Sequence, residues 1–279
     1  MKLLVYGAGV LGSLFAVQMQ EAGHDVALLA RGARLASLRE DGVQLAIADS
    51  PDIRRVPVPV VEAPSDGYDL TTVFVRTHQV DELLPPLAKV DGDVLFLLNW
   101  AAGFEPLRAA LGHDRVLLGF GTGGGTMDGN VIRYRPPNFL TRLITMSIDG
   151  TSPRLDHIIE KFRASGIKAK HEPKMDAWLK THAAFEVPLG RAVHAAGGPA
   201  ALSEDPAAVR RMLSAMRESL PPHPYPRAFN ALRTLPEALL VPVLRRFLGS
   251  QTVLYSGLDN TSPAAAAEYD RLAEQLRAL

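Results

Sequence analysis

The stretch "LVYGAGVLGSLFA", residues 4–16, determines how the first half of the chain is interpreted. Gly7, Gly9 and Gly12 follow directly after an apolar run that begins at Met1. A short apolar run that ends at glycine is typical of a buried strand, and residues 10–21 have the apolar spacing of a helix. The segment therefore predicts a strand, a tight glycine-rich turn and a helix that begins inside the glycine pattern.

Between a strand and a helix, this glycine pattern indicates a dinucleotide-binding turn. We expect Gly7 to permit the turn, Gly9 to let a pyrophosphate approach the backbone, and Gly12 to let the helix pack closely on the sheet. The exposed amides and the helix dipole would stabilise the phosphates. A glycine-rich turn without a ligand is the alternative. The predicted cofactor-binding residues of the turn are Gly7, Ala8, Gly9, Val10, Leu11 and Gly12.

Strand and helix patterns alternate over the rest of the first half of the chain. Apolar runs predict buried strands at residues 25–31, 70–76 and 93–99, and the segments between and after them predict helices at 32–42, 80–89 and 105–112. This alternation favours a parallel sheet with right-handed crossovers. The segments 43–50 and 54–61 look like short strands, and the prolines in the second suggest a sheet edge. Strand-like segments at 115–126, 130–135 and 140–148 are predicted to extend or complete the same sheet.

The pattern becomes helical from Lys174 onward, with prolines and glycines as interruptions. The expected fold class is α/β: an N-terminal Rossmann-type sheet with helices on both faces, followed by an all-helical C-terminal domain. We expect a dinucleotide-binding domain at residues 1–172 and a helical substrate-side domain at residues 173–279.

Composition excludes several functional classes. The 30 Lys and Arg residues balance the 30 Asp and Glu residues, so no strong field favours nucleic acid or an acidic membrane as a partner. The absence of cysteine excludes disulfides and thiolate chemistry, and no apolar run approaches the length of a membrane span. His171-Glu172 lacks the second histidine of a zinc-protease helix, so no metal site is expected. The prediction is a soluble cytoplasmic protein.

The end of the second predicted strand favours NADP(H) over NAD(H). NAD-binding versions of the fold carry Asp or Glu there to bind the ribose 2′-hydroxyl. This chain has Arg31, with Gly32 and Arg34 after it, and no carboxylate at that place. An arginine can pair with a 2′-phosphate that a carboxylate would repel. The alternative interpretation of Arg31 is a solvated surface charge.

The sequence resembles the ketopantoate reductase family, the 2-dehydropantoate 2-reductases. The resemblance rests on "MKLLVYGAGVLGSLFA", on Arg31, and on three later segments: "VRTHQV" at 75–80, "LLNWAAG" at 97–103 and "DAWLKTHAAF" at 176–185. It implies a Rossmann domain and a helical domain with NADPH and a small carbonyl substrate in the cleft. Arg76 and Gln79 match the family's Lys-x-x-Gln element on the cofactor side. Asn99 matches an asparagine that contacts nicotinamide and substrate, and Lys180 matches the catalytic lysine.

The residues themselves support part of this assignment. Hydride addition to a ketone creates negative charge on oxygen, which an ammonium group can stabilise and protonate. Lys180 lies in a mostly apolar helical stretch, although a surface lysine with a packed stem would look the same. Asn99 follows an apolar run at a strand's carboxyl end, where open α/β sheets bind ligands. A simple turn residue is the alternative for Asn99.

The substrate side departs from the family pattern. The family carries asparagines four and eight residues after the catalytic lysine, where this chain has Ala184 and Pro188, and Pro188 is expected to kink or end the helix. Ser256 and Asp259 are a poor match to the family's late serine and glutamate. His182 and Glu186, one helical turn apart, could replace the lost polar groups, although a solvated helix face is the more common reason for such a pair.

Three functional hypotheses follow from these matches and departures. The first is an NADPH-dependent reductase of this family acting on a ketone of the 2-oxo acid type other than ketopantoate. The second is a true 2-dehydropantoate 2-reductase of pantothenate biosynthesis. The third is a non-catalytic NADP-binding sensor, which would need neither Lys180 nor Asn99. The oligomeric state stays open, with a homodimer as one alternative.

Overall fold

The computed structural model of the protein describes residues 1–121, 123–136, 145–250, 253 and 261–278. The chain forms two compact units. The first contains residues 1–75, 79–98 and 104–175; the second contains residues 76–78, 99–103 and 176–279. The expected domain boundary after residue 172 stays a prediction, but two short segments of the N-terminal half, 76–78 and 99–103, belong to the second unit.

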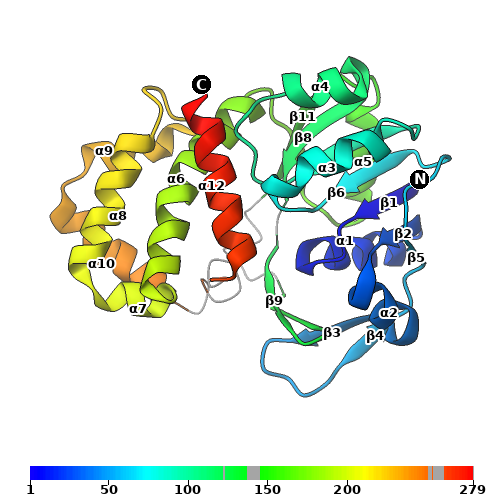
Figure 1. The fold of residues 1–279 in the computed structure, drawn as a ribbon, viewed down its shortest axis with the longest axis horizontal. Helices are drawn as coiled ribbons and strands as arrows, with labels where there is room; N and C mark the ends of the chain where they lie inside the picture. The colour runs from blue at the N-terminus through cyan, green and yellow to red at the C-terminus, as the bar shows by residue number, and fades with distance from the viewer. Residues whose placement is uncertain (122, 137–144, 251–252, 254–260, 279) are drawn as a thin grey trace. The chain divides into compact units, whose positions relative to one another are not determined.

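The first unit is built on an eight-stranded sheet with the order β12-β11-β8-β7-β6-β1-β2-β5 (Figure 1). Its strands from β8 to β5 run parallel, whereas β11 is antiparallel to β8. The parallel arrangement follows from the strand–helix alternation of the sequence, because each helix returns the chain to the same end of the sheet. The strands are β1 (Lys2–Tyr6), β2 (Asp25–Leu29), β5 (Val60–Val61), β6 (Leu70–Val73), β7 (Asp93–Leu97), β8 (Val116–Phe120), β11 (Met146–Gly150) and β12 (Ala169–His171).

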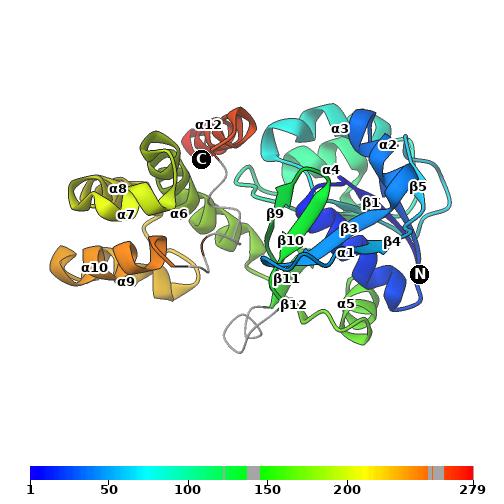
Figure 2. The same cartoon turned by 90° about the horizontal axis from the view of Figure 1, so that it is seen from below.

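Helices cover both faces of this sheet, as predicted (Figure 2). On one face, Phe15 of α1 packs edge-on against Phe162 of α5, with ring centroids 5.4 Å apart. Both rings belong to a core that also contains the fully buried Leu3 and Leu28 of the central strands. The helices of the first unit are α1 (Val10–Glu21), α2 (Gly32–Asp41), α3 (Val80–Leu87), α4 (Glu105–Leu111) and α5 (Leu155–Ala164), with 3₁₀ turn η2 (His113–Arg115) before β8.

A second, four-stranded sheet corrects the sequence prediction. The segments around residues 125 and 131 do not extend the main sheet; they pair with the strands that follow α2, in the order β4-β3-β10-β9. The prolines do mark edges, because β4 ends this sheet and β5 ends the main one. Strand patterns give no information on partners distant in sequence, which is why the second sheet was missed. Its strands are β3 (Val43–Ile47), β4 (Arg54–Val56), β9 (Gly125–Asp128) and β10 (Val131–Tyr134).

The second unit is helical, as predicted. Its longest helix continues through Pro188, so of the two expected effects of this proline, a kink or an end of the helix, the second does not occur. Val187, Leu189 and Val193 are buried around the proline, and this packing holds the helix on both sides of it. The elements are η1 (Thr77–Gln79), α6 (Met175–Ala196), α7 (Pro199–Glu204), α8 (Pro206–Ser219), η4 (Arg227–Phe229), α9 (Asn230–Thr234), α10 (Glu237–Leu248) and α12 (Pro263–Arg277), with Gln79 of η1 grouped with the first unit.

The described helices include none that is long and apolar enough to cross a membrane.

Candidate functional site

The glycine-rich turn joins β1 to α1 as the sequence predicts, and two of its glycines are required by the protein itself. Gly7 has φ +110°, and a Cβ atom there would lie 2.2 Å from the Phe74 carbonyl oxygen. A Cβ atom on Gly12 would lie 2.0 Å from the Gly7 carbonyl oxygen. Neither position can carry a side chain without moving backbone. These two glycines therefore fix the tight turn and the close packing of the turn and of α1 against Phe74, the residue after β6.

Gly9 is different. Its backbone is extended, with φ −76° and ψ −167°, a conformation that any residue adopts. A Cβ atom on Gly9 would meet nothing within 4 Å, and the residue is exposed. Gly9 is also the N-cap of α1, next to the first-turn amides, which have no acceptor within the helix. The open space above Gly9 fits the close approach of an anionic group such as a pyrophosphate.

Arg31 lies two residues after the end of β2 and occupies the N-cap position of α2 without a capping hydrogen bond from its side chain. Its guanidinium Nη2 donates a hydrogen bond to the Tyr6 hydroxyl at 2.7 Å. Burial raises the pKa of the Tyr6 phenol, and the nearby Arg31 opposes that shift. Arg31 is therefore held at the carboxyl ends of β1 and β2, where the ribose-recognising residue of this fold belongs.

Arg34, which the sequence indicated only as a second cation near Arg31, ties α2 to the glycine-rich turn. Its Nε donates to the Ala8 carbonyl oxygen at 3.1 Å, and its Nη1 donates to the Asn130 carbonyl oxygen at 3.1 Å. The side chain thus joins the turn to the β9–β10 connection. This role could not be read from the sequence, because Asn130 lies about 100 residues away in the chain.

The short segment Asn99–Gly103 belongs to the helical unit. Thr77, which is buried, donates from its hydroxyl to the Asn99 carbonyl oxygen at 2.5 Å. The Trp100 indole donates to the Gly103 carbonyl oxygen at 2.7 Å and closes the turn. The side-chain Oδ1 of Asn99 is buried and has no hydrogen-bond partner among the described residues. A buried amide oxygen without a donor is costly, so Asn99 fits a residue that accepts a hydrogen bond from a ligand.

Lys180 projects from α6 toward this segment. Its ammonium donates to Asp176 Oδ2, one turn earlier on α6, at 2.7 Å. The Lys180 side chain is 27% exposed and that of Asp176 42% exposed. A Cβ atom on Gly103 would lie 3.2 Å from Asp176 Oδ1 and 3.9 Å from Lys180 Nζ. The structure therefore brings Lys180 beside the Asn99–Gly103 segment and adds Asp176, which the sequence interpretation did not single out.

Arg76 and Gln79, predicted together on the cofactor side, have different surroundings. The guanidinium of Arg76 forms an ion pair with Glu268 of α12 at 2.7 Å, and Glu268 is 10% exposed. Glu268 also lies 3.5 Å from the backbone nitrogen of Thr77. Gln79 is exposed at the start of α3 and groups with the first unit. The Glu268 partner had no signal in the sequence, because it lies 192 residues from Arg76.

The pair His182 and Glu186 does not lie on a solvated face, so the more common interpretation of such a pair was wrong. Both residues are partly buried on α6. Burial lowers the pKa of His182 from 6.5 to about 4. Burial, and then the charge of Glu268, raises the pKa of Glu186 from 4.5 to about 7. The His182 ring stacks on Trp178 with centroids 4.9 Å apart. A carboxyl group that titrates near neutral pH beside Glu268 can hold or release a proton under physiological conditions.

Other predicted substrate-side positions are apolar or lie outside the described residues. Ala184 is fully buried on α6. Ser256 and Asp259 lie outside the described residues. In the described part of the chain, no group of three or more His, Cys, Asp or Glu side chains could hold a metal ion.

Together, the β1–turn–α1 unit and the main sheet define a Rossmann-type dinucleotide-binding fold. Residues 3–138 match the model of a family described as ketopantoate reductase PanE/ApbA. The chain is thus similar to the ketopantoate reductase family over its N-terminal part, and the two curated relatives described next agree with this similarity.

Two curated relatives are both 2-dehydropantoate 2-reductases. The protein from Archaeoglobus fulgidus is 31% identical over 184 residues, which cover 64% of this chain and 59% of that protein. The protein from Nostoc sp. is 31% identical over 126 residues, which cover 42% of this chain and 38% of that protein. The matches thus span about three fifths of the first relative's length and less of the second's.

Solved structures of similar fold extend over the whole chain. D-mandelate dehydrogenase in complex with NADH has a TM-score of 0.69 at 17% identity, covering 100% of this chain and 98% of that chain. The 2-dehydropantoate 2-reductase from Geobacter metallireducens also has a TM-score of 0.69, at 16% identity, covering 99% of this chain and 98% of that chain. At such identities the likeness shows the fold, including its helical part.

Proposed function

We propose that the protein is an NADPH-dependent reductase that converts a ketone of the 2-oxo acid type to the corresponding alcohol. The observation that carries this proposal is the open space at Gly9, beside a turn whose other two glycines are accounted for by packing. The named activity of the curated relatives, 2-dehydropantoate 2-reductase, supports a reaction at a CH–OH group. The chain covers only part of the length of those relatives, so we propose the substrate separately from the type of reaction.

The cofactor side uses residues of the first unit. The turn Gly7–Gly12 holds the pyrophosphate through the first-turn amides of α1. Arg31 pairs with the 2′-phosphate and gives up its hydrogen bond to the Tyr6 hydroxyl to do so. Gln79 and Arg76 are proposed to lie on the cofactor side as well. The guanidinium of Arg76 is paired with Glu268. In this proposal Arg76 binds the cofactor by exchanging that carboxylate for a group of the cofactor.

The catalytic residues we propose are Lys180 and Asn99. A bound nicotinamide would supply a hydride to the carbonyl carbon of the substrate, which would leave negative charge on the carbonyl oxygen. The Lys180 ammonium stabilises this developing alkoxide and transfers a proton to it, which yields the alcohol and a neutral amine. Asp176 orients the ammonium through its 2.7 Å hydrogen bond, and solvent reprotonates the lysine after product leaves. The amide of Asn99 holds substrate or nicotinamide through its side-chain oxygen, which has no hydrogen-bond partner in the described part of the chain.

The substrate differs from ketopantoate in this proposal, because Ala184 offers no polar group where the resemblance implies an asparagine. The partly buried Glu186 and His182 are available to replace it. The absence of cysteine is consistent with a reducing cytoplasm as the location.

The test is NADPH oxidation by the purified protein against a panel of 2-oxo acids, lactones and other ketones, ketopantoate included. With a turned-over substrate, Lys180→Ala should reduce kcat by about two or more orders of magnitude and leave NADPH binding nearly unchanged. Lys89→Met, which removes an exposed lysine of the first unit, is the matched control and should leave kcat unchanged. Near wild-type turnover by Lys180→Ala would remove Lys180 from the mechanism. Highest activity on ketopantoate would favour the true 2-dehydropantoate 2-reductase, and NADPH binding without turnover of any compound would favour the sensor.

A further inference from the structure

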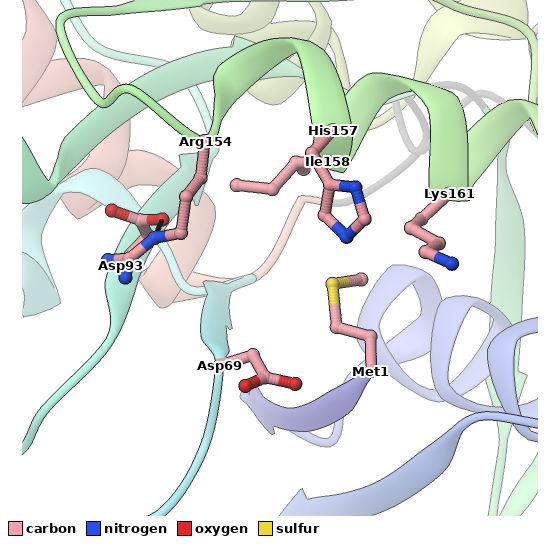
Figure 3. A pocket seen from close by; sticks show the side chains of 7 residues that line it. All are labelled: Met1, Asp69, Asp93, Arg154, His157, Ile158 and Lys161. Carbon is pink, nitrogen blue, oxygen red and sulfur yellow. Dashed lines mark hydrogen bonds and ion pairs between the residues drawn. The ribbon is translucent and has the colours of Figure 1, made fainter.

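The buried ion pair between Asp93 and Arg154 is explained by the fold of the first unit. Asp93 is fully buried at the start of β7, and its Oδ2 accepts a hydrogen bond from Arg154 Nε at 2.6 Å (Figure 3). Arg154 is the N-cap of α5, so the pair joins this helix to the sheet. Asp93 lies at the amino ends of the parallel strands, whereas the glycine-rich turn lies at their carboxyl ends. We therefore assign the pair to the fold and not to the proposed site.

Two buried polar side chains of the helical unit have partners of another kind. Glu268 and Gln275 of α12 are 8% and 6% exposed and lie seven residues apart, which is about two helical turns. They therefore share one side of the helix. Leu272 and Ala273, which lie between them in the chain, are buried as well. Because burying a polar group is costly unless it is hydrogen-bonded, the partners of Glu268 and Gln275 indicate what α12 holds in place.

These partners are in the short segments 76–78 and 99–103. Glu268 Oε2 is paired with Arg76 at 2.7 Å, and Glu268 Oε1 lies 3.5 Å from the backbone nitrogen of Thr77. Gln275 Oε1 accepts a hydrogen bond from the backbone amide of Ala101 at 2.9 Å. Both segments belong to the helical unit, although they follow β6 and β7 in the chain. Polar contacts thus join α12 to both segments.

The backbone around Asn99 is held by two hydrogen bonds. The hydroxyl of Thr77 donates to the carbonyl oxygen of Asn99 itself at 2.5 Å. Gln275 accepts from the amide of Ala101, two residues further on. Both side chains are buried, Thr77 at 1% exposure, so water does not compete freely for these bonds. Together they restrict the backbone from which the Asn99 side chain projects.

We propose that Gln275 and Thr77 are positioning residues that hold Asn99 in the orientation required by its role in the reductase site. The inference rests on the proposed function, because it takes Asn99 as the group that holds substrate or nicotinamide. Gln275 and Thr77 act through the backbone of residues 99–101 and need not touch a ligand themselves. A displacement of about 1 Å in a reacting group can cost about a hundredfold in rate, so the loss of either bond should be measurable.

The experiment uses the full chain with Gln275→Met or Thr77→Val, each of which removes one of the two bonds and nearly keeps the side-chain volume. The first readout is Trp100, which is 3% exposed and becomes the single tryptophan of the chain when Trp178 is replaced by phenylalanine. Both variants should raise the rate constant for acrylamide quenching of Trp100 by about twofold or more, because the segment opens more often. Glu274→Met, at an exposed position of α12, is the matched control and should leave it unchanged.

The second readout connects the two residues to Asn99. Asn99→Ala is measured for its effect on the dissociation constant of NADPH and on kcat and KM of the best compound in the panel. Gln275→Met and Thr77→Val should each change the same quantity in the same direction by about fivefold or more. In the Asn99→Ala protein they should change it further by less than about twofold, because the side chain that they orient is gone. A purely structural role would instead lower the folded fraction equally in both backgrounds, with the dissociation constant and KM unchanged.

Three results would overturn the inference. The first is unchanged quenching of Trp100 in both variants; two variants are used so that a folding defect in one leaves the other to decide. The second is an effect of Asn99→Ala that neither variant reproduces, or effects of both variants that persist undiminished in the Asn99→Ala protein. The third is an Asn99→Ala protein with wild-type NADPH affinity, kcat and KM, which would remove Asn99 from the site and leave the reductase activity standing. If the wild type turns over no compound, the proposed reductase function fails, and Trp100 quenching and the NADPH dissociation constant decide the inference.

Discussion

Replacing Glu186 by glutamine should change how the stability of the helical unit depends on pH. Burial, followed by the charge of Glu268, raises the pKa of Glu186 to about 7, whereas burial lowers the pKa of His182, one turn earlier on α6, to about 4. The groups that face Glu186 from α12 are Glu268 and Tyr269, and the charge of Glu186 in turn helps raise the pKa of Tyr269. Arg76 is paired with Glu268 rather than with Glu186, and none of the contacts described above pairs Glu186 with a cation.

The two shifts act in opposite directions. The folded-state pKa of Glu186 lies above its unfolded value of 4.5, so its contribution to stability is complete below pH 4.5 and is lost as the pH rises through 7. The folded-state pKa of His182 lies below its unfolded value of 6.5, so its contribution is present above pH 6.5 and is lost as the pH falls toward 4. Between about pH 4.5 and 6.5 the wild-type protein gains from one group what it loses from the other.

The size of the effect follows from the shift. The Glu186 pKa changes by 7 − 4.5, or 2.5 units, which sets a ceiling of about 3 kcal/mol at 1.36 kcal/mol per unit. Because the side chain is only partly buried, solvent screening should reduce this to about 1–2 kcal/mol. The difference in unfolding free energy between Glu186→Gln and the wild type should therefore shift in favour of the variant by about 1–2 kcal/mol from pH 4.5 to pH 8.

Urea unfolding at several pH values between 4.5 and 8, followed by tryptophan fluorescence, measures this difference. Trp100 and Trp178 are the two tryptophans of the chain, and both belong to the helical unit, so the signal reports on the unit that contains Glu186. Glu40→Gln, at an exposed position of α2, is the control and should leave the pH profile unchanged. Parallel profiles of the wild type and Glu186→Gln would refute the reasoning, because they would mean that Glu186 has the same pKa in the folded and unfolded chain.

Three further predictions address the glycines and the cofactor. Gly9→Ala should leave the unfolding free energy nearly unchanged but weaken NADPH binding in a fluorescence titration, whereas Gly12→Ala should destabilise the fold by roughly 1–3 kcal/mol, because its Cβ would lie 2.0 Å from a backbone oxygen. Arg31→Asp should weaken NADPH binding by about tenfold or more and NADH binding little; tighter binding of NADH by the wild type would contradict the assignment. Gly190→Ala should lower the urea midpoint, since its Cβ would lie 2.0 Å from Tyr269 Cζ where α6 packs on α12, and a wild-type midpoint would show that the tyrosine moves freely.

The sequence was sufficient for the order of strands and helices because the signals for these elements are local. Apolar runs bounded by glycine defined β1, β2 and β7 to within about two residues of their observed ends. The same reasoning failed for β9 and β10, whose partners are each other and β3 rather than the main sheet. Pairing of short strands depends on contacts between segments about 90 residues apart, which a pattern of alternating residues does not specify.

The candidate site shows the same limit at the level of single side chains. The quoted motifs contained Lys180, and the acid four residues before it could have been found from helical spacing, because Asp176 and Lys180 share one face. No such rule leads from Arg76 to Glu268. The raised pKa of Glu186 could be found only from the structure, because the polarity of a residue on a helix does not reveal whether another helix covers it.

The glycine-rich turn illustrates how a structure can separate residues that a motif treats alike. As a pattern, Gly7, Gly9 and Gly12 have equal weight, and a turn without a ligand would explain all three if each were needed for packing. Two of them are needed, since backbone atoms occupy the space of their side chains. Gly9 is not, because its conformation suits any residue and a Cβ atom there would meet no atom of the described residues within 4 Å. If the turn served only to connect β1 to α1, alanine at this position would fit without a clash, at only the modest cost of replacing glycine by alanine at a helix N-cap. A loss of nucleotide affinity in Gly9→Ala without loss of stability is therefore the result that separates a dinucleotide-binding turn from a purely structural one.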